Sequence, residues 1–133
     1  MKTPIKLGGY IYKWGEKIGR SDHFITKDKG PEIFDVSKSY PVTDESFLYD
    51  DPFSVIGRGS IKFDDEGVWA DITISSEPYA EALLDPEKGE KFKLGFMVMN
   101  KKEDKETGEI IKGYLMGIDV SEIGMEEIEY VHN

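Results

Sequence analysis

In Lys91-Phe92-Lys93-Leu94-Gly95-Phe96-Met97-Val98-Met99, bulky apolar side chains recur at alternate positions. Alternation with period two is typical of a β-strand that buries one face. We expect Leu94, Phe96 and Val98 to form the buried face of this strand. Lys93, Gly95 and Met97 would form the opposite face. A lysine at this point of a strand points to solvent or pairs with an acid, and the interpretation of the chain depends on which.

Two segments before this strand form a predicted hairpin. Val55 to Phe63 and Val68 to Ser75 both alternate, and the acidic turn Asp64 to Gly67 between them ends in glycine. The buried face of the second strand is expected to consist of Val68, Ala70, Ile72 and Ile74.

Alternation also predicts strands at Ile5 to Trp14 and Ile110 to Met116, and one or two more between Ile118 and Val131. Ser76-Glu77-Pro78 has the composition of a helix start, and Asp85-Pro86 ends that short helix. Gly15 to Pro31 and Asp35 to Pro52 are expected to be long loops, and such loops often carry function. The pattern predicts a mainly β chain, an antiparallel barrel or sandwich with one or two short helices, in a single domain spanning residues 1–133.

Composition narrows the function classes. The 133 residues carry a formal net charge of −10, which disfavours binding to nucleic acid through a basic surface. The absence of cysteine excludes disulfides and thiolate chemistry. The sequence contains neither a signal-peptide pattern nor an apolar run of membrane-spanning length, so we expect an intracellular protein without a membrane partner.

Generic motifs add little. The acidic turns do not match the ligand spacing of a calcium loop, and no phosphate-binding glycine motif is present, so we expect neither a metal nor a cofactor. Ser21-Asp22-His23 contains the residue types of a serine-protease triad, but neighbours in sequence rarely converge as a triad does. The favoured interpretation of His23 is an ordinary loop histidine.

Several segments, read in order, carry a family resemblance. The set consists of Gly9-Tyr10-Ile11-Tyr12-Lys13-Trp14-Gly15, Ser21-Asp22-His23-Phe24-Ile25, Asp50-Asp51-Pro52 with Ile56-Gly57-Arg58-Gly59, Asp65-Glu66-Gly67-Val68-Trp69, Phe92-Lys93-Leu94-Gly95-Phe96 after Glu81-Ala82-Leu83-Leu84, and Ile118-Asp119-Val120-Ser121. Together they resemble the prohead (head maturation) serine protease family of tailed phages, over roughly residues 9 to 123. The resemblance implies an antiparallel β-barrel akin to herpesvirus assembly proteases, which cleaves scaffold or capsid protein inside the immature head.

The chemistry of that family needs a serine, a histidine and an acid. The family histidine falls on Asp50 and the family serine on Lys93, and only the acidic position is kept in kind, as Asp119. A carboxylate is a weak base at neutral pH, and a lysine cannot form the acyl ester of a serine. The resemblance therefore implies a degenerate member, a pseudoprotease.

Two interpretations of Lys93 remain open. Asp50, Lys93 and Asp119 could form an acid–lysine–acid cluster, in which the charges compensate one another. Alternatively, Lys93 points to solvent. If hydrolysis survives, Ser121 is the favoured nucleophile, ahead of Ser54 and Ser60, with Lys93 as its base.

Three functions follow. The first is a non-catalytic phage or prophage protein, in the host cytoplasm or the prohead, that binds capsid, scaffold or portal protein, or another copy of itself. The second is an active serine hydrolase that cleaves capsid or scaffold protein. The third is a small acidic β-barrel that binds a peptide or small ligand. Candidate binding surfaces are the two long loops and, if exposed, Met97 and Met99 with Trp69.

Overall fold

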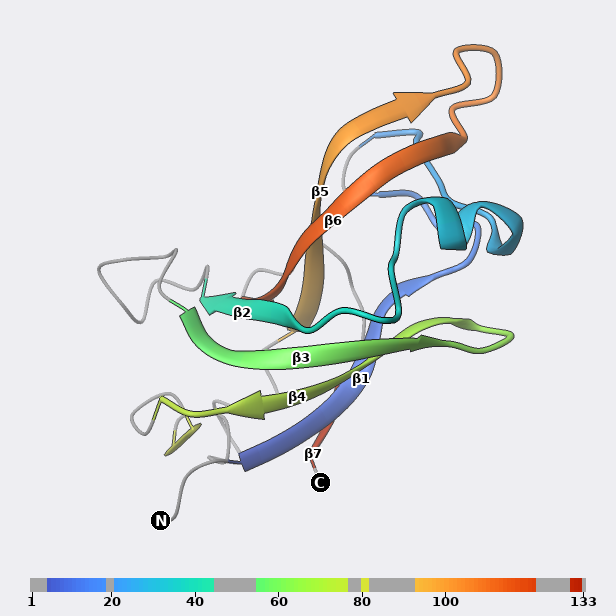
Figure 1. Ribbon diagram of the computed structural model, residues 1–133. Helices are drawn as coiled ribbons and strands as arrows, with labels where there is room; N and C mark the ends of the chain where they lie inside the picture. The colour runs from blue at the N-terminus through green and yellow to red at the C-terminus, as the bar shows by residue number, and fades with distance from the viewer. Residues whose placement is uncertain are drawn as a thin grey trace.

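A computed structural model describes residues 5–18, 21–44, 55–76, 80–81, 93–121 and 130–132. The elements in chain order are strand β1 (Ile5–Lys13), 3₁₀ helix η1 (Lys27–Glu32), and strands β2 (Tyr40–Asp44), β3 (Val55–Phe63), β4 (Gly67–Ile74), β5 (Lys93–Glu103), β6 (Ile110–Ser121) and β7 (Tyr130–His132) (Figure 1). The expected mainly β architecture is confirmed.

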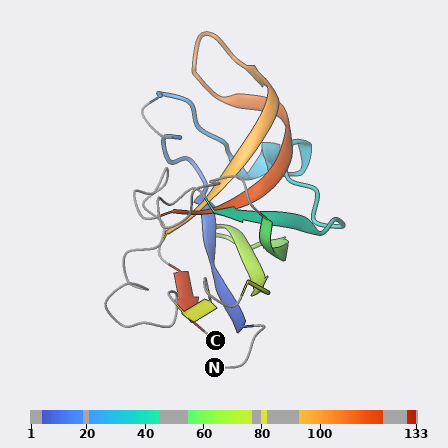
Figure 2. The same cartoon turned by 90° about the vertical axis from the view of Figure 1, so that its left-hand side faces the viewer.

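The strands form one mixed sheet in the order β5-β6-β2-β3-β4-β1-β7. Neighbours pair antiparallel except β2 and β6, which run parallel. Because β2 and β6 are far apart in sequence, this parallel pair joins the β3–β4–β1 part of the sheet to the long β5–β6 ribbon. Figure 1 and Figure 2 both show β5 and β6 extending together beyond the other strands.

The β3–β4 hairpin forms as expected around its acidic turn. The Asp64 amide donates to the Gly67 carbonyl at 3.0 Å, and the Asp64 carboxylate accepts from the amides of Glu66 and Gly67 at 2.7 and 3.0 Å. The predicted apolar face of β4 is buried. At Gly57 the strands approach so closely that a Cβ atom would lie 2.1 Å from the Thr73 carbonyl oxygen, so only glycine fits.

Three expectations about the elements were wrong. β2 lies inside Asp35 to Pro52, and η1 begins inside Gly15 to Pro31, because their short runs carry no clear periodicity. β6 is one strand through Ser121 rather than a strand ending at Met116, since its register shifts preserve pairing with β5.

The short helix is described only in part. The Ala80 amide donates to the Ser76 carbonyl at 2.9 Å, and Ala80 and Glu81 are helical, whereas most of the expected segment lies outside the described residues. In the described part of the chain, no helix is long and apolar enough to cross a membrane.

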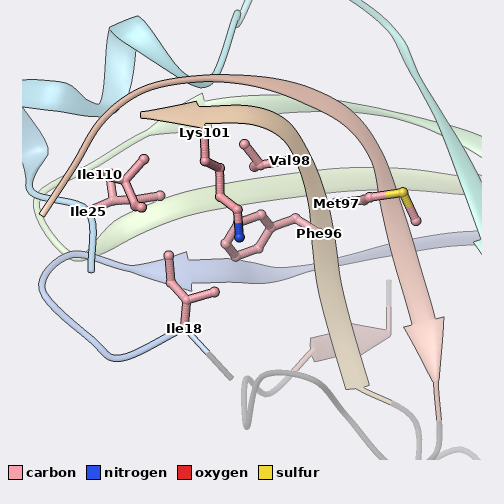
Figure 3. A pocket seen from close by; sticks show the side chains of 7 residues that line it. All are labelled: Ile18, Ile25, Phe96, Met97, Val98, Lys101 and Ile110. Atoms are coloured by element: carbon pink, nitrogen blue, oxygen red, sulfur yellow. The ribbon is translucent and has the colours of Figure 1, made fainter. Parts of the chain in front are cut away.

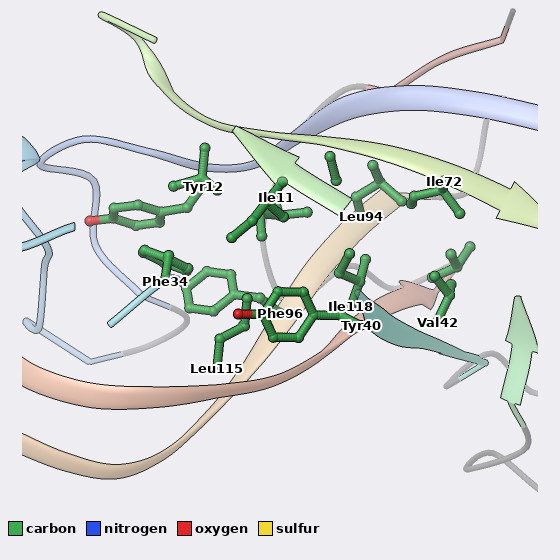
Figure 4. Packing of buried hydrophobic residues seen from close by; sticks show 14 of the residues in the cluster. Ile11, Tyr12, Phe34, Tyr40, Val42, Ile72, Leu94, Phe96, Leu115 and Ile118 are labelled. Carbon is green, nitrogen blue, oxygen red and sulfur yellow. The ribbon is translucent and has the colours of Figure 1, made fainter. Parts of the chain in front are cut away.

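The core lies inside the curl of the sheet (Figure 4). Tyr12 of β1 and Phe96 of β5 meet edge to face across it, with ring centroids 5.6 Å apart. Tyr12 reaches the core because the β1–β4 register shifts between Tyr10 and Tyr12. β5 and β7 are the two ends of the strand order, and no ladder joins them within the described residues, so the barrel-like curl is not closed by hydrogen bonds there.

Candidate functional site

The β5–β6 ladder brings together three of the positions singled out in the sequence. Lys93 lies directly opposite Ser121, and Gly95 lies opposite Asp119. Opposed residues of an antiparallel ladder share a face, as do alternate residues of one strand. The positions of Lys93, Ser121 and Asp119 are therefore neighbours on one face of the ribbon.

The other face of this ladder belongs to the core. Leu94 is opposite Val120 and Phe96 is opposite Ile118, and all four are buried. The alternation expected for the Lys93 strand is thus confirmed for its buried side. It follows that the ladder positions of Lys93 and Asp119 face away from the main apolar cluster.

Asp119 is buried even though its position is on the face away from the core. Its side chain is 2% exposed, and its Oδ1 accepts a hydrogen bond of 2.9 Å from Thr43 Oγ1. Thr43 is the register partner of Asp119 in the parallel β2–β6 pair, so the backbone holds the two side chains together. A buried carboxylate is costly without hydrogen bonds, and Thr43 supplies one.

Sequence reasoning missed Thr43. The segment around Thr43 was expected to be an irregular loop, and 76 residues separate Thr43 from Asp119. A short strand that pairs parallel to a distant strand leaves no local periodic signal. The link between Thr43 and Asp119 therefore became visible only through the register of the parallel β2–β6 pair.

The other positions of the predicted site are described only in part. Asp50 and Ser54 lie outside the described residues, and for Lys93 and Ser121 the description covers the backbone alone. Ser60 is exposed on β3. The acid–lysine–acid cluster thus stays a prediction, with Lys93 and Asp119 as ladder neighbours.

His23 is a loop histidine with its own partner. Its Nε2 pairs with the Glu103 carboxylate, its backbone amide donates to Ser21 Oγ at 3.2 Å, and Asp22 pairs with Lys17 at 3.3 Å. Because the imidazole contacts Glu103, Ser21-Asp22-His23 does not form a triad. Among the described residues, no three His, Asp or Glu side chains gather in a group able to hold a metal ion.

Two hollows lie beside the β5–β6 ribbon. The first, of about 130 Å³, is lined by Ile18, Ile25, Phe96, Met97, Val98, Lys101 and Ile110. In Figure 3 the Lys101 side chain reaches across it toward Phe96. The second, of about 160 Å³, is lined by Pro31, Glu32, Ile33, Asp35, Lys38, Tyr40, Gly113, Tyr114 and Leu115. Neither is lined by a tryptophan, so neither is the deep Tyr- and Trp-lined pocket that would favour a ligand-binding β-barrel.

Comparison with known proteins identifies the fold. No protein-family model matches the chain, and no curated protein matches it. A solved structure of KSHV (herpesvirus) protease, in complex with a hexapeptide phosphonate inhibitor, matches 90% of this chain with a TM-score of 0.56 and 12% sequence identity. The chain spans 60% of the length of that protease. It therefore has a viral protease-like fold, while the likeness to the phage prohead family rests on the sequence motifs.

Proposed function

We propose that this chain is a protease-fold protein that acts by binding, as an assembly factor in the head of a tailed phage or prophage. Its partner would be the capsid, scaffold or portal protein. Support comes from two independent directions. The ordered motifs resemble a phage head protease family, and the fold resembles a herpesvirus protease.

The residue at the nucleophile position carries the proposal. Lysine stands at position 93, where the resemblance requires a serine, and Asp50 stands where it requires the base. Loss of the nucleophile and the base together removes orders of magnitude in rate. At the acidic position, Asp119 accepts a hydrogen bond from a threonine hydroxyl, which cannot act as a general base at neutral pH.

Co-expression tests this proposal. The chain would be produced with the capsid, scaffold and portal proteins of its own genome, one at a time, and the products analysed by affinity purification and intact mass. We expect a stable complex with one of them and no cleavage. A cleaved partner, with cleavage lost in Lys93→Ala or Ser121→Ala, would contradict a purely binding role.

A second candidate function is favoured by one observation. The direct opposition of Lys93 and Ser121 in the ladder is compatible with a Ser-Lys dyad, in which the amine activates the hydroxyl. In that case the chain is a serine hydrolase that cleaves capsid or scaffold protein.

A fluorophosphonate probe separates the two functions. The dyad predicts covalent labelling of Ser121, located by peptide mass spectrometry and abolished in Lys93→Ala. Ser60→Ala is the matched control, since Ser60 is an exposed strand serine and its loss would leave labelling unchanged. Absence of labelling at Ser121 in the folded wild-type protein rules out the dyad.

A further inference from the structure

The outer face of the β5–β6 ribbon exposes large apolar side chains. Met99, Tyr114 and Met116 are 47%, 49% and 41% exposed, and Met99 lies directly opposite Tyr114 in the ladder. Lys102 and Lys112 follow on the same two strands, toward the tip of the ribbon, and are also exposed. We call these five residues the Lys-Met face. Trp69, on β4, does not belong to it, because three strands separate β4 from β5.

The two lysines of this face oppose each other. Lys102 and Lys112 are register partners, and like charges directly opposite in a ladder are destabilising. Within the described residues, neither has a carboxylate within the 4.0 Å of an ion pair. This arrangement occurs in a chain with a net charge of −10, where acids are plentiful.

The acids nearest in sequence are engaged elsewhere. Glu103, adjacent to Lys102, pairs with His23, and Glu109, near Lys112, accepts a hydrogen bond of 2.8 Å from Thr26 Oγ1. These contacts hold the 21–26 loop against the ribbon and turn the carboxylates of Glu103 and Glu109 toward that loop. Neither carboxylate forms an ion pair with Lys102 or Lys112.

The second hollow continues this surface. Lys38 lies over the Tyr114 ring, with its Nζ 4.9 Å from the ring centroid, and it pairs with Asp35 at 3.9 Å. The Ser37 hydroxyl donates a hydrogen bond to the Asp35 carboxylate. This bond is the main cause that lowers the pKa of Asp35, so the carboxylate is charged and already hydrogen-bonded within its own loop. A third lysine therefore borders the exposed aromatic ring beside a hollow.

We propose that the Lys-Met face docks an acidic peptide segment with apolar side chains from a partner protein. Carboxylates of the segment would sit between Lys102 and Lys112 and relieve their repulsion. Its apolar side chains would cover Met99 and Met116, whose flexible thioethers adapt to different shapes. The inference names a surface for the binding role proposed above, and in that sense rests on it.

Methionine methyl NMR tests the surface directly. The chain has five methionines, so selective ¹³C-methyl labelling gives a simple spectrum. The probe is a synthetic peptide of alternating Glu and Leu. We expect the signals of Met99 and Met116 to shift on titration. A peptide of alternating Lys and Leu, and one of alternating Glu and Ser, should each bind much more weakly.

Charge reversal supplies the decisive comparison. Lys102→Glu/Lys112→Glu should weaken binding of the Glu-Leu peptide about tenfold or more, since two favourable contacts become repulsive. Lys17→Glu/Lys62→Glu changes the net charge equally, at exposed lysines outside the face, and should bind like wild type. Equal weakening in both double variants would show a nonspecific charge effect and overturn the proposal.

Two other occupants are outcomes of the same experiment. If a single-stranded oligonucleotide of equal charge displaces the peptide and shifts the same methyl signals, the face is a nucleic-acid site and the proposal is wrong. If sedimentation shows a dimer that Lys102→Glu/Lys112→Glu dissociates, the occupant is a second copy and the proposal is also wrong.

Failure of the surface and failure of the assembly role can be told apart. A capsid, scaffold or portal complex that survives Lys102→Glu/Lys112→Glu refutes this surface and leaves the assembly role intact. Peptide binding at Met99 and Met116, without any complex on co-expression, supports the surface and refutes the assembly role.

Discussion

Thr43 Oγ1 donates a hydrogen bond of 2.9 Å to Asp119 Oδ1 across the parallel β2–β6 pair, although 76 residues separate them in sequence. This contact links the two parts of the curled sheet at Asp119, the position to which the family resemblance assigns the acid. It also satisfies part of a carboxylate that is 2% exposed. The junction of the sheet and the candidate site are therefore the same place.

Thr43→Val should destabilise the fold. The variant keeps the side-chain shape but removes the donor to a buried carboxylate, so we expect a loss of about 1.5–3 kcal/mol in the free energy of unfolding. Urea denaturation measures it. Thr43→Ser, which keeps a hydroxyl, is the matched control and should recover most of the loss. A Thr43→Val variant as stable as wild type would show that the hydrogen bond contributes nothing net.

Restoring the family residues at two positions tests the degenerate-triad interpretation. Asp50→His/Lys93→Ser should react with a fluorophosphonate at position 93, because the family resemblance implies that a histidine base would then stand near a serine nucleophile. General-base assistance contributes about 10²-fold or more, so Lys93→Ser alone should label slower by that factor. Asp50→His/Lys93→Ala controls for labelling at other serines. A folded double variant that stays unlabelled at position 93 would contradict the assignment of these positions.

The Tyr12 hydroxyl supports the loop that follows β1. It accepts a hydrogen bond of 2.8 Å from the Ile25 amide and donates to the Glu16 carbonyl. Tyr12→Phe keeps the ring in the core but leaves the buried Ile25 amide without this acceptor, at a cost of about 1–3 kcal/mol.

Urea denaturation and amide hydrogen exchange check the Tyr12→Phe variant. The Ile25 amide should exchange faster in the variant than in wild type. Tyr114→Phe is the control, because the exposed ring of Tyr114 should tolerate the change within about 0.5 kcal/mol. Unchanged exchange at Ile25 would contradict the role given to the hydroxyl.

Tyr10 makes stability depend on alkaline pH. Its hydroxyl donates to Asp64 Oδ2 at 2.6 Å, and this hydrogen bond, followed by burial, raises the pKa of Tyr10 from 10.0 to about 12. Because the folded-state pKa is the higher one, the contribution is fully present below pH 10 and is lost as pH rises through the interval to about 12.

Spectrophotometric titration and urea midpoints measured across that interval test Tyr10. Wild type should lose stability between pH 10 and about 12, and Tyr10→Phe should lose less over the same range. Burial also raises the pKa of Tyr40, so Tyr40 should still titrate late in the variant. An identical pH slope in both proteins would show that the Tyr10–Asp64 contact does not carry the effect.

The sequence predicted those parts of the fold that depend on neighbours in the chain. The β3–β4 hairpin followed from two alternating segments and the acidic turn at Asp64, and the buried side of β5 followed from the period of Leu94 and Phe96. It missed β2 and η1, since short runs do not establish a period. Through a family resemblance it singled out Lys93 and Asp119 and proposed that they are neighbours, but it could not give the register that relates them or the contact with Thr43.

Period two is a property of one strand's backbone, so the sequence by itself determined a mainly β chain and which side of the Lys93 strand is buried. Through its resemblance to the phage protease family, the sequence also implied that lysine and aspartate stand where that family has its nucleophile and its base. Only the tertiary structure decided that Lys93 lies opposite Ser121 and that Thr43 bonds to Asp119. Those relations depend on register between distant segments, which is set by how the whole sheet curls around its core and leaves no local trace in the chain.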